Sequence, residues 1–178
     1  MKVILVAGKA GSGKTYLGSC LVELAKEKGI RALQTEYSKY VKMYAREILG
    51  YEGNRENKPR GFLQETGTLL RKRFGENFFV KRMLEDFFVY ENYFDLVVIS
   101  DVRLRQEIKG FRNSKYKEVI AIRVENDLQN PSLSEEQKKH ETEIELENYE
   151  GFDYNIKDAT KENIKVFASQ LIEGLNNE

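Results

Sequence analysis

Short apolar runs alternate along the chain with stretches in which apolar residues recur every three or four positions. The run at residues 3–7 is rich in β-branched side chains and ends at Gly8, a pattern typical of a strand that is buried on both faces. A second continuous run, at residues 94–99, predicts another buried strand. Further strands are expected at residues 30–35, 118–124 and 152–156.

Helical periodicity fills most of the remaining chain. The first helical pattern follows Gly13 and consists of Leu17, Cys20, Leu21, Leu24 and Ala25. Further helices are predicted at residues 37–49, 60–74, 76–90 and 104–111, and around Ile164, Phe167, Ala168, Leu171 and Ile172. The polar stretch 51–59 is expected to be a loop, and 125–139 is either a mobile flap or an ordinary surface connection. Strands that alternate with helices predict an α/β fold around a mainly parallel sheet.

Length and composition restrict the picture further. A chain of 178 residues fits a single domain, 1–178. Lysine plus arginine and aspartate plus glutamate both number 29, so no net charge favours nucleic acid or an anionic membrane. The lone Cys20 and the lone His140 do not make a structural zinc site. The run at 3–7 is too short for a signal peptide or a membrane span, which predicts a cytoplasmic protein.

Residues 8–15 match the pattern G-x-x-x-x-G-K-[ST] without a mismatch. Glycines in this pattern let backbone N–H groups close around phosphate oxygens, at the positive end of the helix that follows. Lys14 would reach the β- and γ-phosphates of ATP, and the Thr15 hydroxyl would bind Mg²⁺. The expected ATP-binding residues are Gly8, Lys9, Ala10, Gly11, Ser12, Gly13, Lys14 and Thr15. The alternative, a flexible turn, fits less well because the motif joins a predicted strand to a predicted helix.

Asp101 follows the predicted strand at residues 94–99. An acidic residue at the carboxyl end of a strand near the phosphate loop can hold Mg²⁺ directly or through water. Asp101 is therefore, together with Thr15, the expected metal ligand. The alternative is that Asp101 caps the helix predicted to follow it.

The other motifs narrow the class of nucleotide-binding protein. A guanine-nucleotide switch would carry a base-reading N-K-x-D segment, whereas the only Asn-Lys pair, Asn57-Lys58, is followed by Pro59-Arg60. Motor and transporter subunits usually need a longer chain than 178 residues. A small-molecule kinase is the large class that remains.

One face of the predicted helix 60–74 is suited to an anionic substrate. At about 100° per residue, four positions form one stripe beside an apolar face. The stripe consists of Arg60, Gln64, Gly67 and Arg71. Arginine suits two-point contact with a phosphate, and the glycine would let a ligand approach the backbone. Arg103 and Arg105 would add positive charge nearby. The alternative is a solvated face with ordinary ion pairs.

Several further segments occur in order within residues 1–145. They are Y-S-K-Y-V-K at 37–42, A-R-E-I-L-G at 45–50, K-P-R-G-F-L-Q-E-T-G-T at 58–68, Arg71, I-S-D-V-R at 99–103 and H-E-T-E at 140–143. Together with the phosphate loop, they resemble the bacteriophage-type deoxynucleoside monophosphate kinases, whose fold relatives include animal phosphomevalonate kinase. The last segment is similar to the family's H-x-S-E, with Thr142 in place of serine.

The resemblance implies a P-loop NTPase fold of the nucleoside monophosphate kinase type, with an acceptor-binding helical segment at about 37–91 and a small lid at about 125–140. It implies ATP at the phosphate loop, and relatives are often homodimers. It places the substrate near Lys42, Arg60, Gln64, Arg71 and Arg103. The sequence departs from the family where D-V-R-F-P-N-E becomes D-V-R-L-R-Q-E at 101–107, and where Lys138 and Lys139 stand at positions that are commonly arginine.

We therefore expect an enzyme that converts ATP and a (deoxy)nucleoside monophosphate, both small molecules, into ADP and a diphosphate, with Mg²⁺. A phosphate acceptor is already anionic, so the reaction needs cations rather than a strong base. The expected catalytic residues are Lys14, Arg71, Asp101 and Arg103. His140 is then a hinge or contact residue, or an exposed residue without a function. The alternatives are a kinase for another phosphorylated molecule, such as phosphomevalonate, and a non-catalytic regulatory module that binds ATP.

Overall fold

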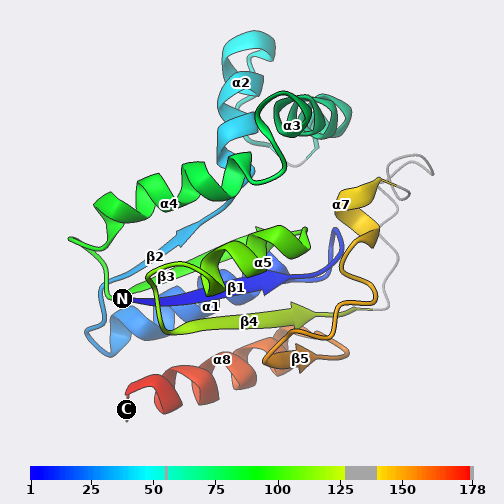
Figure 1. Cartoon of the computed structure of the whole chain (residues 1–178). Helices are drawn as coiled ribbons and strands as arrows, with labels where there is room; N and C mark the ends of the chain where they lie inside the picture. Colours follow the sequence, from blue (N-terminus) through cyan, green and yellow to red (C-terminus); the bar gives the residue numbers. More distant parts are fainter. Residues whose placement is uncertain (55, 127–139, 177–178) are drawn as a thin grey trace.

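The computed structural model describes residues 1–54, 56–126 and 140–176. In this part of the chain, parallel strands form one five-stranded sheet in the order β2-β3-β1-β4-β5. The strands are β1 (Lys2–Ala7), β2 (Ala32–Thr35), β3 (Leu96–Val102), β4 (Val119–Val124) and β5 (Tyr154–Ile156). Because all the strands run the same way, their carboxyl ends meet at one edge of the sheet (Figure 1).

Helices cover both faces of the sheet (Figure 1). They are α1 (Lys14–Glu27), α2 (Lys39–Leu49), α3 (Arg60–Phe74), α4 (Phe78–Tyr90), α5 (Arg105–Arg112), α7 (Glu141–Ile144) and α8 (Lys161–Asn176). Apolar residues of α1 and α8 pack on one face, and those of α2, α3, α4 and α5 pack on the other. Figure 1 shows α2 and α3 at one end of the molecule, beyond α4. No described helix is long and apolar enough to cross a membrane.

β1 shows how the sequence pattern produces the two layers. Successive side chains of a strand point to opposite faces. Val3 and Leu5 accordingly join the core beneath α2–α5, whereas Ile4 and Val6 join the core beneath α1 and α8. All four are fully buried. The run at residues 3–7 is apolar throughout because both faces of the strand are covered.

The structure confirms every predicted strand and helix and shifts some boundaries. β3 begins at Leu96 and ends at Val102, later than the predicted run 94–99 at both ends. Asp95 directly precedes the strand, and its carboxylate accepts two hydrogen bonds from the Arg31 guanidinium, at 2.7 and 2.9 Å. The short helix α7 was not predicted, since four residues are too few to show a helical period.

Candidate active site

The loop between β1 and α1 forms a tight cradle at the carboxyl edge of the sheet. Gly8 and Gly13, near its two ends, have φ angles of 148° and 99°. A Cβ at Gly8 would lie 2.3 Å from the carbonyl oxygen of Val124, the last residue of β4. Only glycine fits at this position, because any side chain would collide with the neighbouring strand. The motif at residues 8–15 therefore forms the compact loop that its spacing predicts.

Lys14 and Ser12 have polar atoms inside this cradle. The Lys14 side chain is buried, and its Nζ donates a hydrogen bond to the carbonyl of Lys9 at 2.6 Å. The Ser12 hydroxyl is also buried and has no hydrogen-bond partner among the described residues. A buried hydroxyl normally has a partner, and a phosphate oxygen would supply one. The chemistry of the loop thus fits the phosphates of a nucleotide.

Thr15, the predicted Mg²⁺ ligand, lies one residue into α1 and is exposed. Its carbonyl accepts hydrogen bonds from Gln34 Nε2 and Ser19 Oγ, each at 3.1 Å. The same Gln34 amide donates to Ser100 Oγ on β3 at 2.9 Å. A polar network therefore ties the start of α1 to the two strands beside it, next to the strand that carries Asp101.

Asp101 lies in β3, and its carboxylate accepts backbone N–H groups from the segment that leads into α2. Oδ1 accepts from Tyr37 N at 2.7 Å, and Oδ2 accepts from Ser38 N at 2.9 Å. The expected alternative, a cap for the helix after β3, is wrong: the residue before α5 is Leu104. Asp101 instead holds the start of a helix that is distant in sequence. Its role as a metal ligand stays a prediction.

Cationic side chains gather between α2, the start of α3 and the turn after β3. The Lys42 ammonium lies 2.5 Å from the Glu36 carboxylate, just beyond β2. Burial lowers the pKa of Lys58, and the positive charges of Lys42, Arg60 and Arg103 lower this pKa further, while Glu36 raises it. These charges are therefore close enough to act on one another. We call Lys42, Lys58, Arg60 and Arg103 the cation cluster.

Lys58 and Glu36 are not among the site residues that the sequence predicts. Lys58 directly precedes Pro59 and Arg60, and two cations around a proline at a helix start are a usable indication of an anion site. Glu36 offers no comparable indication. Its place beside Lys42 depends on how the chain passes from β2 into α2.

The predicted stripe on α3 exists, and its two ends differ in exposure. Arg71 is only 6% exposed, and Gly67 is buried, so the alternative of a solvated face is wrong for Arg71. Arg60 and Gln64 are half-buried. A Cβ at Gly67 would lie 3.6 Å from Arg71 Nη1, which is an ordinary contact, so no neighbouring protein atom requires glycine here. That this glycine lets a ligand approach the backbone stays a prediction. That the stripe binds a substrate stays a prediction.

Glu107 is a buried carboxylate that the sequence does not single out. Its Oε2 accepts the backbone N–H of Arg103 at 2.7 Å and that of Leu104 at 3.0 Å, which fixes the turn from β3 into α5. Burial raises the pKa of Glu107 to about 8; the Asp101 charge also raises it, while the two backbone hydrogen bonds and the Arg71 charge lower it. Glu107 thus holds the backbone from which the Arg103 side chain extends.

Residues 140–147 contact both the phosphate loop and the turn after β3. Lys9 in the phosphate loop pairs with Glu147 at 2.6 Å. Arg105, which the sequence places near the strand end, instead binds Glu145: its backbone N–H donates to Glu145 Oε1 at 3.0 Å and its Nε to the carbonyl at 3.2 Å. His140 is half-buried and bonded to Thr68, so it is not an exposed residue.

The predicted lid is described only at its two ends. Arg123 Nε pairs with Glu125 at 2.8 Å, and Asn126 Nδ2 donates to the carbonyl of Ala159 at 3.4 Å. Residues 127–139, including Lys138 and Lys139, lie outside the described part of the chain. The lid and its cation stay predictions.

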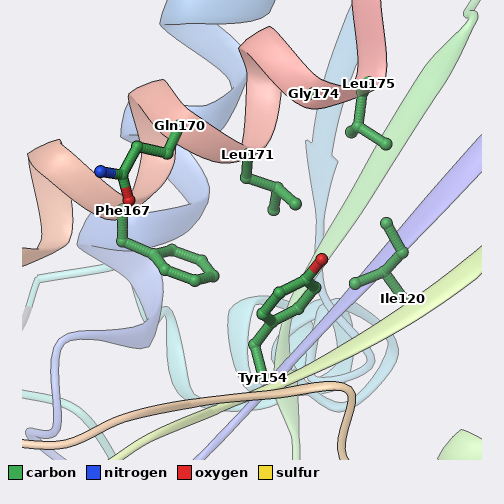
Figure 2. Close-up of a pocket in the computed structure, with 7 residues that line it drawn as sticks. All are labelled: Ile120, Tyr154, Phe167, Gln170, Leu171, Gly174 and Leu175. Carbon is green, nitrogen blue, oxygen red and sulfur yellow. The ribbon is translucent and has the colours of Figure 1, made fainter. Parts of the chain in front are cut away.

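A pocket of about 280 Å³ lies apart from these residues, between α8 and the strands β4 and β5 (Figure 2). Its lining is Ile120, Tyr154, Phe167, Gln170, Leu171, Gly174 and Leu175. Ile120 is near the start of β4, whereas the phosphate loop adjoins Val124 at its end. None of the predicted site residues lines this pocket.

No family model and no curated protein matches the chain. The shikimate kinase of Aquifex aeolicus is similar in structure, with a TM-score of 0.52, 13% identity, and 99% of this chain and 98% of that chain covered. The Mycobacterium tuberculosis APS kinase in complex with AMPPNP and APS has a TM-score of 0.52 and 16% identity, with 98% and 97% covered. The chain has the P-loop kinase fold.

The P-loop kinase fold confirms the predicted fold class, a mainly parallel sheet flanked by helices behind a phosphate loop. In this fold the phosphate loop and the cation cluster both lie at the carboxyl edge of the sheet, where open parallel sheets bind their ligands. The pocket in Figure 2 does not lie at this edge, because its lining residues belong to β4, β5 and α8.

Proposed function

We propose that the protein transfers the γ-phosphoryl group of ATP to the phosphate of a nucleoside monophosphate, with a deoxynucleotide as the preferred acceptor. The observation that carries the proposal is the cation cluster with the buried Arg71 beside it. Positive charges that lie this close together attract an anion. A phosphate acceptor supplies that anion, whereas a neutral hydroxyl acceptor does not.

The phosphate loop would bind the donor. The APS kinase with the same fold is known in complex with AMPPNP, which supports ATP at residues 8–15. Ser12 Oγ and the loop N–H groups would hold phosphate oxygens, and Lys14 would exchange the Lys9 carbonyl for the transferring phosphoryl group. Mg²⁺, when bound, supplies charge neutralisation between the phosphates, with Thr15 and Asp101 as its protein ligands.

The cation cluster would hold the acceptor together with Arg71 and Gln64. Arg60, Arg71 and Arg103 suit two-point contact with phosphate oxygens, while Lys42 adds charge and Gln64 a hydrogen bond. These groups cancel the repulsion between donor and acceptor phosphates and align the attacking oxygen. No general base is required, because the attacking oxygen is already negative.

Two alternatives share part of this site. Phosphomevalonate or another phosphorylated small molecule would use the same cations, and a regulatory module would bind ATP at the same loop without transferring phosphate. The proposed partners are small molecules for both kinases, whereas the regulatory module would act through a partner. The homodimer that the family resemblance implies stays part of the proposal.

A coupled assay of ADP release tests the function. The purified protein is given ATP, Mg²⁺ and one acceptor at a time: each deoxynucleoside and ribonucleoside monophosphate, phosphomevalonate, and shikimate and gluconate as hydroxyl acceptors. We expect ADP release to depend on a nucleoside monophosphate. The Lys14→Ala variant is the control, with turnover lowered about a hundredfold or more.

The outcomes separate the candidates. Release with phosphomevalonate alone would replace the nucleotide as acceptor. Release with shikimate or gluconate would contradict a phosphate acceptor. ATP binding without release for any acceptor would favour the regulatory module.

A further inference from the structure

His140 contacts two threonines, and each of these threonines accepts a hydrogen bond from an arginine. Its Nε2 is 3.2 Å from Thr68 Oγ1 on α3, and Arg71 Nη2 donates to the same hydroxyl at 3.3 Å. Its Nδ1 is 2.9 Å from Thr142 Oγ1, and the carbonyl of Thr142 accepts from Arg103 Nη1 at 3.3 Å. One imidazole therefore connects both arginines, through one threonine on each side.

The groups around the ring indicate which of its nitrogens carries the proton. The backbone N–H of Thr142 donates to His140 Nδ1 at 3.3 Å, so Nδ1 is an acceptor and the ring proton lies on Nε2. Nε2–H then donates to Thr68 Oγ1. A hydroxyl oxygen has two acceptor positions, and His140 and Arg71 occupy both.

We propose that His140 is a positioning residue of the acceptor site, which holds Arg71 through Thr68 and Arg103 through Thr142. The proposal rests on the proposed function, in which these two arginines bind the acceptor phosphate. An arginine side chain loses considerable freedom when it is fixed, and fixing it before the acceptor arrives removes that cost from binding. The loss of His140 should therefore weaken acceptor binding and leave ATP binding unchanged.

Two substitutions separate the two sides of the ring. The amide of His140→Gln reaches about as far as Nε2 and keeps a donor for Thr68. The amide of His140→Asn keeps an acceptor near Nδ1 for Thr142 but does not reach Thr68. Thr68→Val removes the shared hydroxyl with little change of shape. Thr66→Val, on the same helix, controls for the effect of valine on α3.

Steady-state kinetics with the best acceptor from the ADP-release assay give the first measurement. We expect Thr68→Val and His140→Asn each to raise the acceptor KM by about three- to tenfold, the effect of one or two hydrogen bonds. His140→Gln keeps the bond to Thr68 and loses the acceptor for Thr142, so it should raise the acceptor KM by less than His140→Asn does. Thr66→Val should stay near wild type, and the Kd of AMPPNP should not change. The double variant of Thr68→Val and His140→Asn should be no worse than either single variant, because both remove the same bond.

Nuclear magnetic resonance gives a second measurement that needs no acceptor. His140 is the only histidine, so its ring resonances are assigned without ambiguity. For the neutral form of the ring, the nitrogen shifts should report a proton on Nε2 and none on Nδ1. Thr68→Val should move the Nε2 resonance and leave that of Nδ1 nearly unchanged.

A proton on Nδ1 would overturn the proposal. So would a wild-type KM in both Thr68→Val and His140→Asn under conditions in which Arg71→Ala raises the KM. A different result identifies a failure of the proposed function instead: if Arg71→Ala leaves the KM unchanged, or if no acceptor releases ADP, the acceptor site is wrong and the positioning role fails with it.

Discussion

The Glu36 carboxylate and the Lys42 ammonium form an ion pair at 2.5 Å inside the cation cluster. A carboxylate of the protein is thus already paired with Lys42, one of the cations to which we assign acceptor binding. An incoming phosphate would have to compete with this carboxylate and would be repelled by it. A hydroxyl acceptor, in contrast, could use the carboxylate as a general base.

Glu36→Gln distinguishes these roles. We expect the acceptor KM to fall by about two- to fivefold, with kcat within about twofold of wild type, because the amide frees Lys42 and removes the repulsion. Glu47→Gln, an exposed change on α2, is the matched control. A loss of about a hundredfold in kcat would make Glu36 a general base and would point to a hydroxyl acceptor.

Ser12→Ala tests whether the buried hydroxyl serves a ligand. The free variant should be more stable than wild type by up to about 1 kcal/mol, because an unpaired buried hydroxyl is removed. The increase in Tm that AMPPNP causes should be smaller in the variant. Thermal unfolding with and without AMPPNP measures both effects, and Ser19→Ala, which loses a hydroxyl with partners, should not be stabilised. A larger AMPPNP effect in Ser12→Ala would remove Ser12 from the donor site.

Arg71→Ala tests acceptor recognition. We expect a higher acceptor KM and a lower kcat, a combined loss of about 2 to 4 kcal/mol in kcat/KM, with ATP binding nearly unchanged. Arg71→Lys should recover only part of the loss, because an ammonium cannot make the two-point contact. Arg73→Ala, at an exposed position of α3, should resemble wild type. If Arg71→Ala weakens ATP binding alone, the stripe faces the donor.

The raised pKa of Glu107 predicts how the free energy of unfolding depends on pH. Its pKa rises from 4.5 to about 8 on folding, so between these values the native state holds a proton that the unfolded state has released. The free energy of unfolding should therefore fall as pH rises through this window, by up to about 1.4 kcal/mol per pH unit relative to Glu107→Gln. Urea unfolding of both proteins across the window measures the difference. Parallel curves would mean that native Glu107 is ionised throughout.

Local patterns predicted the scaffold and the donor loop well, because both depend on neighbours in sequence. The apolar run at residues 3–7 and the glycines of residues 8–15 each carry their own structural requirement. On the acceptor side, the stripe on α3 followed from helical spacing, which shows that Arg60 and Arg71 share a face but not that Arg71 is buried.

The parts that the sequence did not predict depend on contacts between distant segments. Asp101 binds the backbone at Tyr37, and His140 binds Thr68, although each pair is far apart in the chain. Periodicity cannot reveal such contacts, since it reports only on one element at a time. The sequence places Lys58 beside Arg60, but it does not show that Lys42 and Arg103 also lie close to Lys58.

The strand order also governs how the protein is made. β1 is synthesised before both of its partners, β3 and β4, and its first pairing with β3 joins Lys2 to Leu96. Pairings of such long range fold slowly, since the intervening chain must be closed into a loop before they form. The phosphate loop at the end of β1 therefore acquires its shape late, after β4 has been synthesised and Val124 packs against Gly8. Nucleotide binding can begin only once β4 has paired with β1.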